Sequence, residues 1–420
     1  MSAPLPPDSL AFAFLNAAQV VAAVLDGQSL ADGLLARVPT DARPAVQDLV
    51  YGSLRQYGRG DFLLGRLLER PLAVPTVHAL LLAALYRLET RLEQAHTVVD
   101  QAVRAAGELA GGRLKGLVNG VLRNYLRRRD TLLAELAADE VASLAHPDWW
   151  LRHLQVAHPG HWQAIVAAGN SAPPMALRVN RQRGGRDDYL VQLRAAGIEA
   201  TSRGSDGLLL AKPLPVDRLP GFGAGLVSVQ DLGAQRAAEI LDPAAGSRVL
   251  DACAAPGGKT AHLLERADLD LLALDLKPSR CRRIEENLSR LGLAARVRAA
   301  DAAKPDQWWD GQPFDAVLAD VPCTASGVVR RHPDAKWLRR EADIASFART
   351  QSLLLDALWR VVKPGGKLLY ATCSVFPEEN SRQVDRFVAR QPQALRRHEE
   401  QLLPDAEHDG FYYCLLEKPL

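Results

Sequence analysis

The C-terminal part of the chain alternates short apolar segments with longer amphipathic ones, and this alternation constrains the fold most. From about residue 236 onward, apolar segments of strand length occur at residues 248–251, 271–275, 296–300, 316–319 and 367–371. Apolar strands separated by helices are typical of a doubly wound parallel sheet, which buries both of its faces under helices. Ligands bind such sheets at the carboxyl ends of the strands, so we expect the functional residues directly after these segments.

The first of these strands leads into residues 251–260, with the sequence DACAAPGGKT. A strand, a glycine-containing turn and a helix form a corner at which backbone N–H groups approach a nucleotide ligand. The turn matches neither GxGxxG nor GxxxxGK(S/T), so neither a dinucleotide site nor an ATP phosphate site is indicated. We predict that the turn binds a cofactor through Cys253, Ala254, Ala255, Pro256, Gly257, Gly258 and Lys259.

Acidic residues end three consecutive strands of the predicted sheet. Asp251 ends the first strand, Asp275 comes 24 residues later at the end of the second, and Asp301 follows the third. An acid at this interval is able to accept the ribose hydroxyls of an adenosine ligand. A single strand-end aspartate is more often an ordinary capping residue. Three in register, however, predict an adenosine cofactor that contacts Asp275 and Asp301.

The five cysteines all lie in the C-terminal part, and none forms a CxxC pair. This argues against a disulfide framework or a structural zinc site and favours a reducing cytoplasm. Three of them are interpreted as inert thiols: Cys253, Cys281 and Cys414. Cys323 and Cys373 differ because each follows a predicted strand at the ligand edge, close to Asp320. A thiolate, an acid and an adenosine cofactor together indicate covalent activation of an electrophilic ring followed by group transfer.

The rest of the chain is expected to form two further domains. Residues 1–142 have helical apolar periodicity and almost no strand signal, which predicts an all-helical domain. Residues 143–235 begin at a cluster of histidine, proline and tryptophan (146–150) that marks a boundary, and they predict a small α+β domain before the sheet domain at 236–420. The apolar start at residues 10–25 has no basic residue before it, so we interpret it as a helix and not as a signal peptide.

Charge is nearly balanced, with 51 Lys plus Arg against 49 Asp plus Glu, so bulk charge alone does not bind nucleic acid. A local basic patch occupies residues 113–129, where Arg123 and Arg127 share a helix face and no acidic residue occurs. Both a solvated helix face and an RNA-binding face fit this patch. The middle domain leaves a similar choice between an RNA-facing module and a plain connector at Arg178, Arg181, Arg183 and Arg186.

Three motifs resemble those of the RNA cytosine-5 methyltransferases, which use S-adenosyl-L-methionine. They are DACAAPGGKT at 251–260, DVPCTASG at 320–327 and YATCSVFPEEN at 370–380. The family usually has alanine where this chain has Val321, a conservative apolar change. GVVRRHPD at 327–334, with Lys336 and Trp337, is similar to the bacterial 16S rRNA subgroup. So are three segments that resemble its NusB-like helical RNA-binding domain: QDLVYGSLR (47–55), RPL (70–72) and KGLVNGVLR (115–123).

The resemblance implies a Rossmann-like class I methyltransferase domain that methylates C5 of a specific cytidine in 16S rRNA, naked or in an early small-subunit precursor. It implies that Cys373 adds to C6 of the base and that Asp320, which also borders the cofactor, binds or protonates N3. Cys323 would assist loss of the C5 proton and of the Cys373 adduct. The residues expected to contact RNA are Lys115, Arg123, Arg127, Arg330 and Arg331. We expect a cytoplasmic monomer with no metal and no membrane association.

Two other functions fit parts of the sequence. A DNA cytosine-5 methyltransferase has the same cofactor and chemistry, but its nucleophile is the cysteine of a PC motif, which here is Cys323. A non-catalytic RNA-binding factor would keep the C-terminal domain only as a scaffold. The presence of both cysteines and of all three strand-end acids argues against the non-catalytic factor. To distinguish the RNA enzyme from the DNA enzyme, one would identify which cysteine forms the covalent bond to the base.

Overall fold

The computed structural model describes residues 5–420, which form two compact units. The first unit contains the chain up to Ser171 together with Val329–Arg340. The second contains Ala172–Val328 and Glu341–Leu420. The predicted middle segment is therefore divided, since residues 143–171 pack with the first unit and 172–235 with the second. The limits of three separate domains stay predictions.

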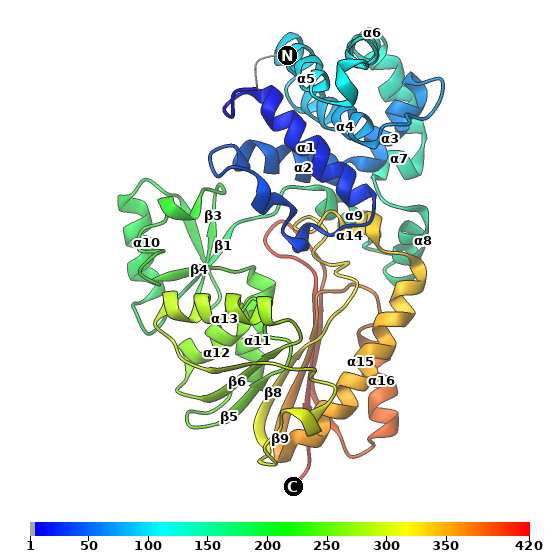
Figure 1. Cartoon of the computed structure of the whole chain (residues 1–420). Coiled ribbons are helices and arrows are strands. Elements are labelled where there is room, and N and C mark those ends of the chain that lie inside the picture. Colours follow the sequence, from blue (N-terminus) through cyan, green and yellow to red (C-terminus); the bar gives the residue numbers. More distant parts are fainter. Residues whose placement is uncertain (1–4) are drawn as a thin grey trace. The chain divides into compact units, whose positions relative to one another are not determined.

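The first unit is built from helices (Figure 1). Helix α1 (Leu10–Leu25) has no charged residue, and it packs against α2, α4 and α5. A helix that is apolar on all sides is stable when it is buried, and Phe14 and Val21 of α1 are fully buried. The side chain of Ser9 caps the helix by accepting the Phe12 N–H at 3.1 Å. The other helices of this unit are α2 (Arg43–Arg55), α3 (Tyr57–Leu67), α4 (Pro75–Thr90), α5 (Ala95–Gly107), α6 (Lys115–Ala138), α7 (Glu140–Leu144), α8 (Asp148–Ala157), α9 (Trp162–Asn170) and α14 (Ala335–Leu338).

The second unit contains a seven-stranded sheet in the order β10-β11-β9-β8-β5-β6-β7. The strands from β9 to β7 are parallel: β5 (Arg248–Asp251), β6 (Asp270–Asp275), β7 (Arg296–Ala299), β8 (Phe314–Asp320) and β9 (Val362–Thr372). Helices α11 (Leu232–Leu241), α12 (Gly258–Arg266) and α13 (Pro278–Leu291) cover one face. Helices α15 (Glu341–Val361) and α16 (Ser381–Arg390) cover the other. This is the doubly wound arrangement that the alternation of strands and helices predicts.

Two strands were not expected from the sequence, and they make the sheet mixed instead of parallel. Strand β11 (Phe411–Glu417) pairs antiparallel with β9, and β10 (Leu395–Leu402) pairs antiparallel with β11 at the sheet edge. The segment of β10 reads LRRHEEQL, and a charged edge strand has no apolar run to reveal it. Because β11 lies between β10 and β9, its residues Phe411 to Leu416 are buried.

The same unit also holds a small antiparallel sheet in the order β2-β3-β1-β4. It consists of β1 (Ala176–Val179), β2 (Ala200–Arg203), β3 (Gly207–Leu210) and β4 (Val227–Val229), with helix α10 (Arg186–Ala195). Leu177, Tyr189 and Leu208 belong to its separate apolar core. The predicted small α+β module is therefore present.

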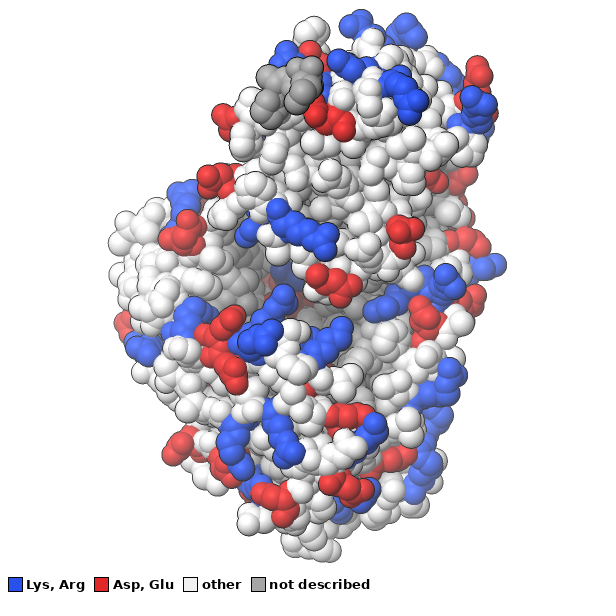
Figure 2. Space-filling model, viewed as in Figure 1, with Lys and Arg blue, Asp and Glu red and all other residues white. Residues whose placement is uncertain are grey.

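Within residues 5–420, no helix combines the length and the apolar character needed to span a membrane. Figure 2 shows Lys and Arg side chains interspersed with Asp and Glu over the visible face. That mixture agrees with the formal net charge of +2.

Candidate functional site

The carboxyl ends of β5, β6, β8 and β9 meet at one edge of the sheet because these strands are parallel neighbours. Asp251 ends β5, Asp275 ends β6 and Asp320 ends β8, while Cys373 directly follows β9. The topology therefore brings together most of the residues that the sequence predicts. Asp301 lies beyond β7 on the same edge, where its carboxylate accepts the Ala303 N–H at 3.0 Å.

The two cysteines singled out by the sequence touch each other. The Sγ atoms of Cys323 and Cys373 are 3.3 Å apart, although the residues are 50 positions apart in the chain. Cys323 is buried and Cys373 is half-buried. The hydrogen bond to Cys373, together with burial, raises the pKa of the Cys323 thiol well above its usual value. Cys373 is the more exposed of the two sulfur-bearing residues, so it is the better candidate for a nucleophile that meets a substrate.

Lys259 forms an ion pair with Asp320 in the same site. Its Nζ donates to Asp320 Oδ2 at 2.6 Å, and it also lies 5.6 Å from the centre of the Phe411 ring. Burial lowers the pKa of Lys259, but the Asp320 carboxylate more than offsets this effect, so the pKa lies above its usual value. The sequence places Lys259 in the cofactor turn. In the structure its ammonium reaches the acid beside the cysteines, because it occupies the first turn of α12.

The predicted cofactor turn is tightly built. Gly257 has φ of +95°, and a Cβ at this position would lie 3.2 Å from Ile284 Cα, so a side chain there would be strained. Asp275, with 2% of its surface exposed, accepts the Ala255 N–H at 3.3 Å and the Lys277 N–H at 3.2 Å. The Asp275 carboxylate thus holds the turn as well as ending β6. The next residue, Leu276, is an apolar side chain that is 67% exposed. In the sequence, its position directly after a strand-end acid is the signal that could have marked it as a residue of the site.

Asp251 lies beneath this turn with no exposed surface. Its Oδ2 accepts a hydrogen bond from Thr260 Oγ1 at 2.6 Å, whereas its Oδ1 has no hydrogen-bond partner among the described residues. Burial raises the pKa of this carboxyl to about 7. Buried polar atoms normally have partners. An unsatisfied buried oxygen at this turn fits a turn that receives a polar ligand group.

Glu379 is a residue of the site that the sequence analysis did not single out, although it lies in the YATCSVFPEEN motif. It is fully buried, and its carboxylate accepts hydrogen bonds from Thr324 and Ser374. These residues directly follow Cys323 and Cys373. Only the folded chain brings them together.

The predicted RNA contacts are spread over different environments. Lys115, Arg123 and Arg127 are exposed on α6, and Arg123 Nε donates to Asn119 Oδ1 at 3.0 Å. Lys115 and Arg123 line a groove of about 510 Å³ between α5 and α6, together with His96 and Asp100.

The other two residues expected to contact RNA, Arg330 and Arg331, belong to residues 330–340, which pack within the first unit. Arg330 is 2% exposed, whereas Arg331 is half-buried. Lys336 is fully buried, and its ammonium donates to the Arg55 carbonyl, the Ala145 carbonyl and Asn170 Oδ1 at 2.8–3.0 Å. The burial of Arg330 argues against its expected contact with RNA, and packing with these oxygen atoms likewise removes Lys336 from the surface.

In the middle module, Arg178 faces inward. It donates to both oxygens of Glu265 at 2.7 and 2.8 Å and to the Gly258 carbonyl at 2.8 Å, and both side chains of the ion pair are buried. This arginine connects β1 to the helix that follows the cofactor turn. The sequence left open whether the middle-module arginines face RNA or belong to a plain connector, and the contacts of Arg178 fit a connector.

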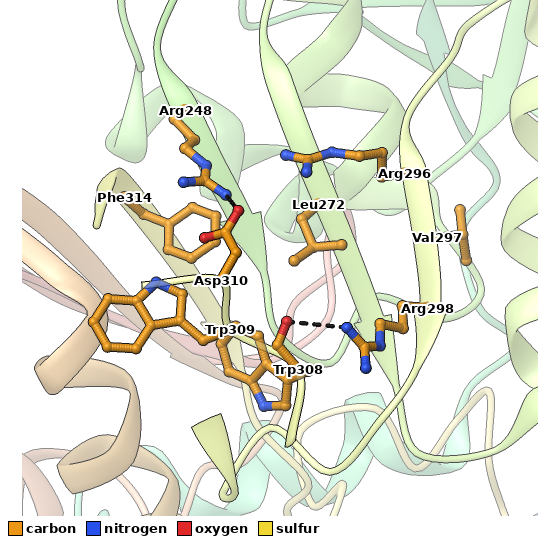
Figure 3. A pocket seen from close by; sticks show the side chains of 9 residues that line it. All are labelled: Arg248, Leu272, Arg296, Val297, Arg298, Trp308, Trp309, Asp310 and Phe314. Atoms are coloured by element: carbon orange, nitrogen blue, oxygen red, sulfur yellow. Dashed lines mark hydrogen bonds and ion pairs between the residues drawn. The ribbon is translucent and has the colours of Figure 1, made fainter. Parts of the chain in front are cut away.

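A pocket of about 280 Å³ opens at the other end of the strands (Figure 3). Arg248 begins β5 and Phe314 begins β8, and both line it. Arg248 donates to Asp310 at 2.5 Å, and Arg298 donates to the Trp308 carbonyl at 3.1 Å (Figure 3). Its lining includes none of the predicted site residues, and these two guanidinium groups already have partners. The candidate reaction site is therefore the carboxyl edge. Among residues 5–420, no cluster of His, Cys, Asp and Glu side chains suited to a metal ion was found.

Three family models match the chain. They are the 16S rRNA methyltransferase RsmB/F over residues 238–417, the ferredoxin-like domain of RsmF/B-like methyltransferases over 146–217, and the NusB family over 12–127. They confirm the predicted combination of a NusB-like helical domain, a small α+β domain and a Rossmann-like methyltransferase domain.

Whole-chain relatives agree with these models. The chain is 44% identical over 418 residues to ribosomal RNA small subunit methyltransferase B of Vibrio vulnificus, covering 96% of this chain and 98% of that protein. The protein of the same name from Pseudomonas syringae pv. tomato is 46% identical over 431 residues, with 96% of each chain covered. Among solved structures, the crystal structure of PH0851 covers 100% of both chains with a TM-score of 0.80 at 23% identity, a likeness of fold.

Proposed function

The chain belongs to the RsmB/F family of 16S rRNA methyltransferases, and from this membership we propose a specific reaction. The chain transfers a methyl group from S-adenosyl-L-methionine to C5 of one cytidine in 16S rRNA, through a covalent bond between Cys373 and C6. The observation that carries this proposal is the contact between the sulfur atoms of Cys323 and Cys373 at 3.3 Å, at the strand edge that also holds the Lys259–Asp320 pair.

The cofactor turn fits S-adenosyl-L-methionine on three observations. Gly257 leaves no room for a side chain, Asp251 keeps an unsatisfied buried oxygen, and Leu276 presents an exposed apolar surface beside Asp275. Residues 253–258, Asp275 and Asp301 would hold the cofactor. When bound, it supplies an electrophilic methyl group on a positively charged sulfur.

Cys373 performs the activating step. C5 of cytosine is a weak nucleophile until a thiolate adds to C6, which places electron density on C5. A Cys373 thiolate can only accept a hydrogen bond, so the Cys323 thiol at 3.3 Å would donate to it and stabilise its negative charge. When Cys373 leaves, Cys323 passes its proton to the departing sulfur, and the Cys323 thiolate formed in this way accepts the proton from C5.

Asp320 and Lys259 act on the opposite side of the ring. Negative charge develops at N3 when the thiolate adds to C6, so a group that binds or protonates N3 lowers the barrier. Asp320 is partly exposed, with 29% of its side-chain surface accessible, and Lys259 donates to it at 2.6 Å. Lys259 holds Asp320 in place, and its ammonium supplies the proton that Asp320 passes to N3.

The RNA must present the target base outside a helical stack, because addition occurs on the face of the ring. The substrate is 16S rRNA, naked or in an early precursor particle, and the chain acts as a cytoplasmic monomer. Lys115, Arg123 and Arg127 on α6 contribute phosphate contacts, and Arg331 is a further candidate.

Bisulfite mapping tests the proposal. Purified chain and S-adenosyl-L-methionine are incubated with 16S rRNA from a strain that lacks this protein, and the RNA is sequenced after bisulfite treatment. One cytidine should become protected, and the Cys373→Ala variant should leave it unprotected. Absence of a protected cytidine on both naked rRNA and precursor particles would contradict the proposal, as would transfer to DNA in preference to RNA.

A further inference from the structure

Glu379 occupies the centre of a buried polar network behind the two cysteines. Its Oε1 accepts the Thr324 N–H at 2.9 Å and Gln351 Nε2 at 3.1 Å. Its Oε2 accepts Thr324 Oγ1 at 2.5 Å and Ser374 Oγ at 2.6 Å. Glu379 has no exposed surface, so these four donors replace the water that a carboxylate would otherwise bind.

The donors lie next to the reactive groups along the chain. Thr324 directly follows Cys323, Ser374 directly follows Cys373, and Gln351 also donates to the Pro322 carbonyl at 3.0 Å. One carboxylate therefore binds both cysteine loops, which leave different strands of the sheet. Two hydroxyl contacts also join the loops, since Ser374 Oγ lies 2.9 Å from Ser326 Oγ and 3.3 Å from Thr324 Oγ1.

Asn380, the next residue, strengthens the hold on one of these loops. It accepts Thr372 Oγ1 at 2.6 Å and donates to the Ser374 carbonyl at 2.8 Å, so it contacts the residues on either side of Cys373. A direct bond between the loops adds to this, since the Gly327 N–H donates to the Cys373 carbonyl at 2.9 Å. The position of each sulfur atom is thus set by polar contacts of its neighbours.

The network uses neutral donors. No lysine or arginine of the described residues forms an ion pair with Glu379, and its charge is balanced only by hydroxyl, amide and backbone N–H groups. Burial raises the pKa of Glu379, and the hydrogen bonds from Ser374, Thr324 and Gln351 oppose that rise. A buried carboxyl without a cation is costly, and contacts to both cysteine loops give a reason for its presence here.

We propose that Glu379 is a positioning residue that fixes the separation of the Cys323 and Cys373 sulfur atoms by binding the loops that carry them. The proposal rests on the proposed function, in which Cys373 forms the adduct and Cys323 assists its release. Addition needs only Cys373, whereas release needs both sulfur atoms at short distance. Loosening the loops should therefore slow release more than addition.

The proposal distinguishes three substitutions of Glu379. In Glu379→Gln the amide oxygen still accepts the Thr324 and Gln351 N–H groups, and the amide NH₂ faces hydroxyls that are able to accept a hydrogen bond. This variant should keep the two loops in place. Glu379→Ala removes the carboxylate that binds both loops and leaves only the direct bonds between them, and Glu379→Asp is one methylene too short to reach both loops. Glu378→Ala is the matched control, because Glu378 pairs with Arg382 outside the network.

The first measurement reports on the sulfur atoms without any substrate. The oxidant diamide takes two protons and two electrons from a pair of thiols and leaves a disulfide, so its rate of linking Cys323 to Cys373 depends on their proximity. Peptide mapping identifies this link among the other thiols. The rate should fall about tenfold in Glu379→Ala and Glu379→Asp and stay near the wild-type rate in Glu379→Gln and Glu378→Ala. Wild-type linking in Glu379→Ala would overturn the proposal.

The second measurement follows the reaction. With labelled 16S rRNA, Glu379→Ala should accumulate the covalent protein–RNA adduct on denaturing gels, and its release should slow about a hundredfold, with S-adenosyl-L-methionine affinity unchanged. Equal losses in cofactor affinity and in release would indicate general disruption and overturn the positioning role.

If Glu379→Ala does not fold, Thr324→Val and Ser374→Ala are used instead, because each removes one hydroxyl donor to Glu379. Both variants should link Cys323 to Cys373 more slowly than the wild type with diamide, and wild-type linking in both would refute the proposal. Loss of methylation by the wild-type chain, with the cross-linking pattern intact, would instead refute the proposed function alone.

Discussion

Replacing Asp251 with asparagine should change how the stability of the second unit depends on pH. Asp251 is completely buried at the end of β5, and only its Oδ2 has a partner, the Thr260 hydroxyl. Asparagine has the same shape and keeps an oxygen for Thr260, but it does not titrate. Any constant cost of the substitution is the same at every pH, so the pH dependence isolates the carboxyl group.

The size and sign of the effect follow from the pKa of Asp251. Burial raises it from the ordinary value of 3.8 to about 7, so the folded chain binds this proton more tightly than the unfolded chain. The stabilising contribution is complete below pH 3.8 and is lost as the pH rises toward 7. The difference between these two pKa values corresponds to about 4 kcal/mol, since each pKa unit is worth about 1.36 kcal/mol.

Hydrogen exchange of peptides that cover β5 measures this difference locally, which suits a chain of two units. The ratio of wild-type to variant exchange rates cancels the intrinsic effect of pH on exchange. Between pH 4 and pH 8 the ratio should rise by about a thousandfold, as the wild type loses stability and Asp251→Asn does not. Asp270→Asn, which removes an exposed carboxylate of the same unit, is the control. A ratio that stays constant for Asp251→Asn would refute the reasoning from burial.

Three further predictions concern the reaction and its ligands. Cys373→Ala should abolish methyl transfer with cofactor binding intact, whereas Cys323→Ala should accumulate a covalent protein–RNA adduct on denaturing gels; the reverse pattern would favour the arrangement of a DNA cytosine-5 methyltransferase. Asp275→Ala should weaken S-adenosyl-L-methionine binding more than about tenfold in titration calorimetry, because a charge-assisted hydrogen bond of about 1.5–3 kcal/mol is lost, and an unchanged affinity would remove Asp275 from the site. Reversal of charge at Arg123 and Arg127 should weaken RNA binding and flatten its salt dependence; wild-type affinity and salt slope would mean that this helix face is only solvated.

Local patterns in the sequence were enough for the elements that depend on local physics. Helix α1 has the predicted bounds of Leu10–Leu25, and β5 has the predicted bounds of Arg248–Asp251. An uncharged helical segment and a short apolar run before a glycine turn are each recognisable within one window of sequence. The gathering of Asp251, Asp275, Asp320 and Cys373 was also accessible, because parallel strands place their carboxyl ends on one edge.

Features that depend on partners distant in the chain could not be predicted from local sequence patterns. Strand β10 is rich in charged residues and exists because β11 provides its pairing groups. Strand β11 itself pairs with β9, which lies at least 40 residues earlier in the chain. Lys336 looks like part of a basic surface stretch, yet three oxygen atoms from residues 55, 145 and 170 bind its ammonium inside the first unit. Sequence pattern assigns a charged residue to solvent by default, and only the folded chain reveals such a set of acceptors.

The ion pair of Arg178 and Glu265 joins the middle module to the helix that follows the cofactor turn. Both side chains are buried, and Arg178 also donates to the carbonyl of Gly258, the first residue of α12. Breaking a buried pair by removing one partner costs about 3–5 kcal/mol, because the remaining charge stays without compensation. The connection therefore resists separation of β1 from the helix that begins at the turn. A module held in this way shares one compact unit with the catalytic sheet, so the backbone of the cofactor turn is supported from the middle module as well as from its own strand.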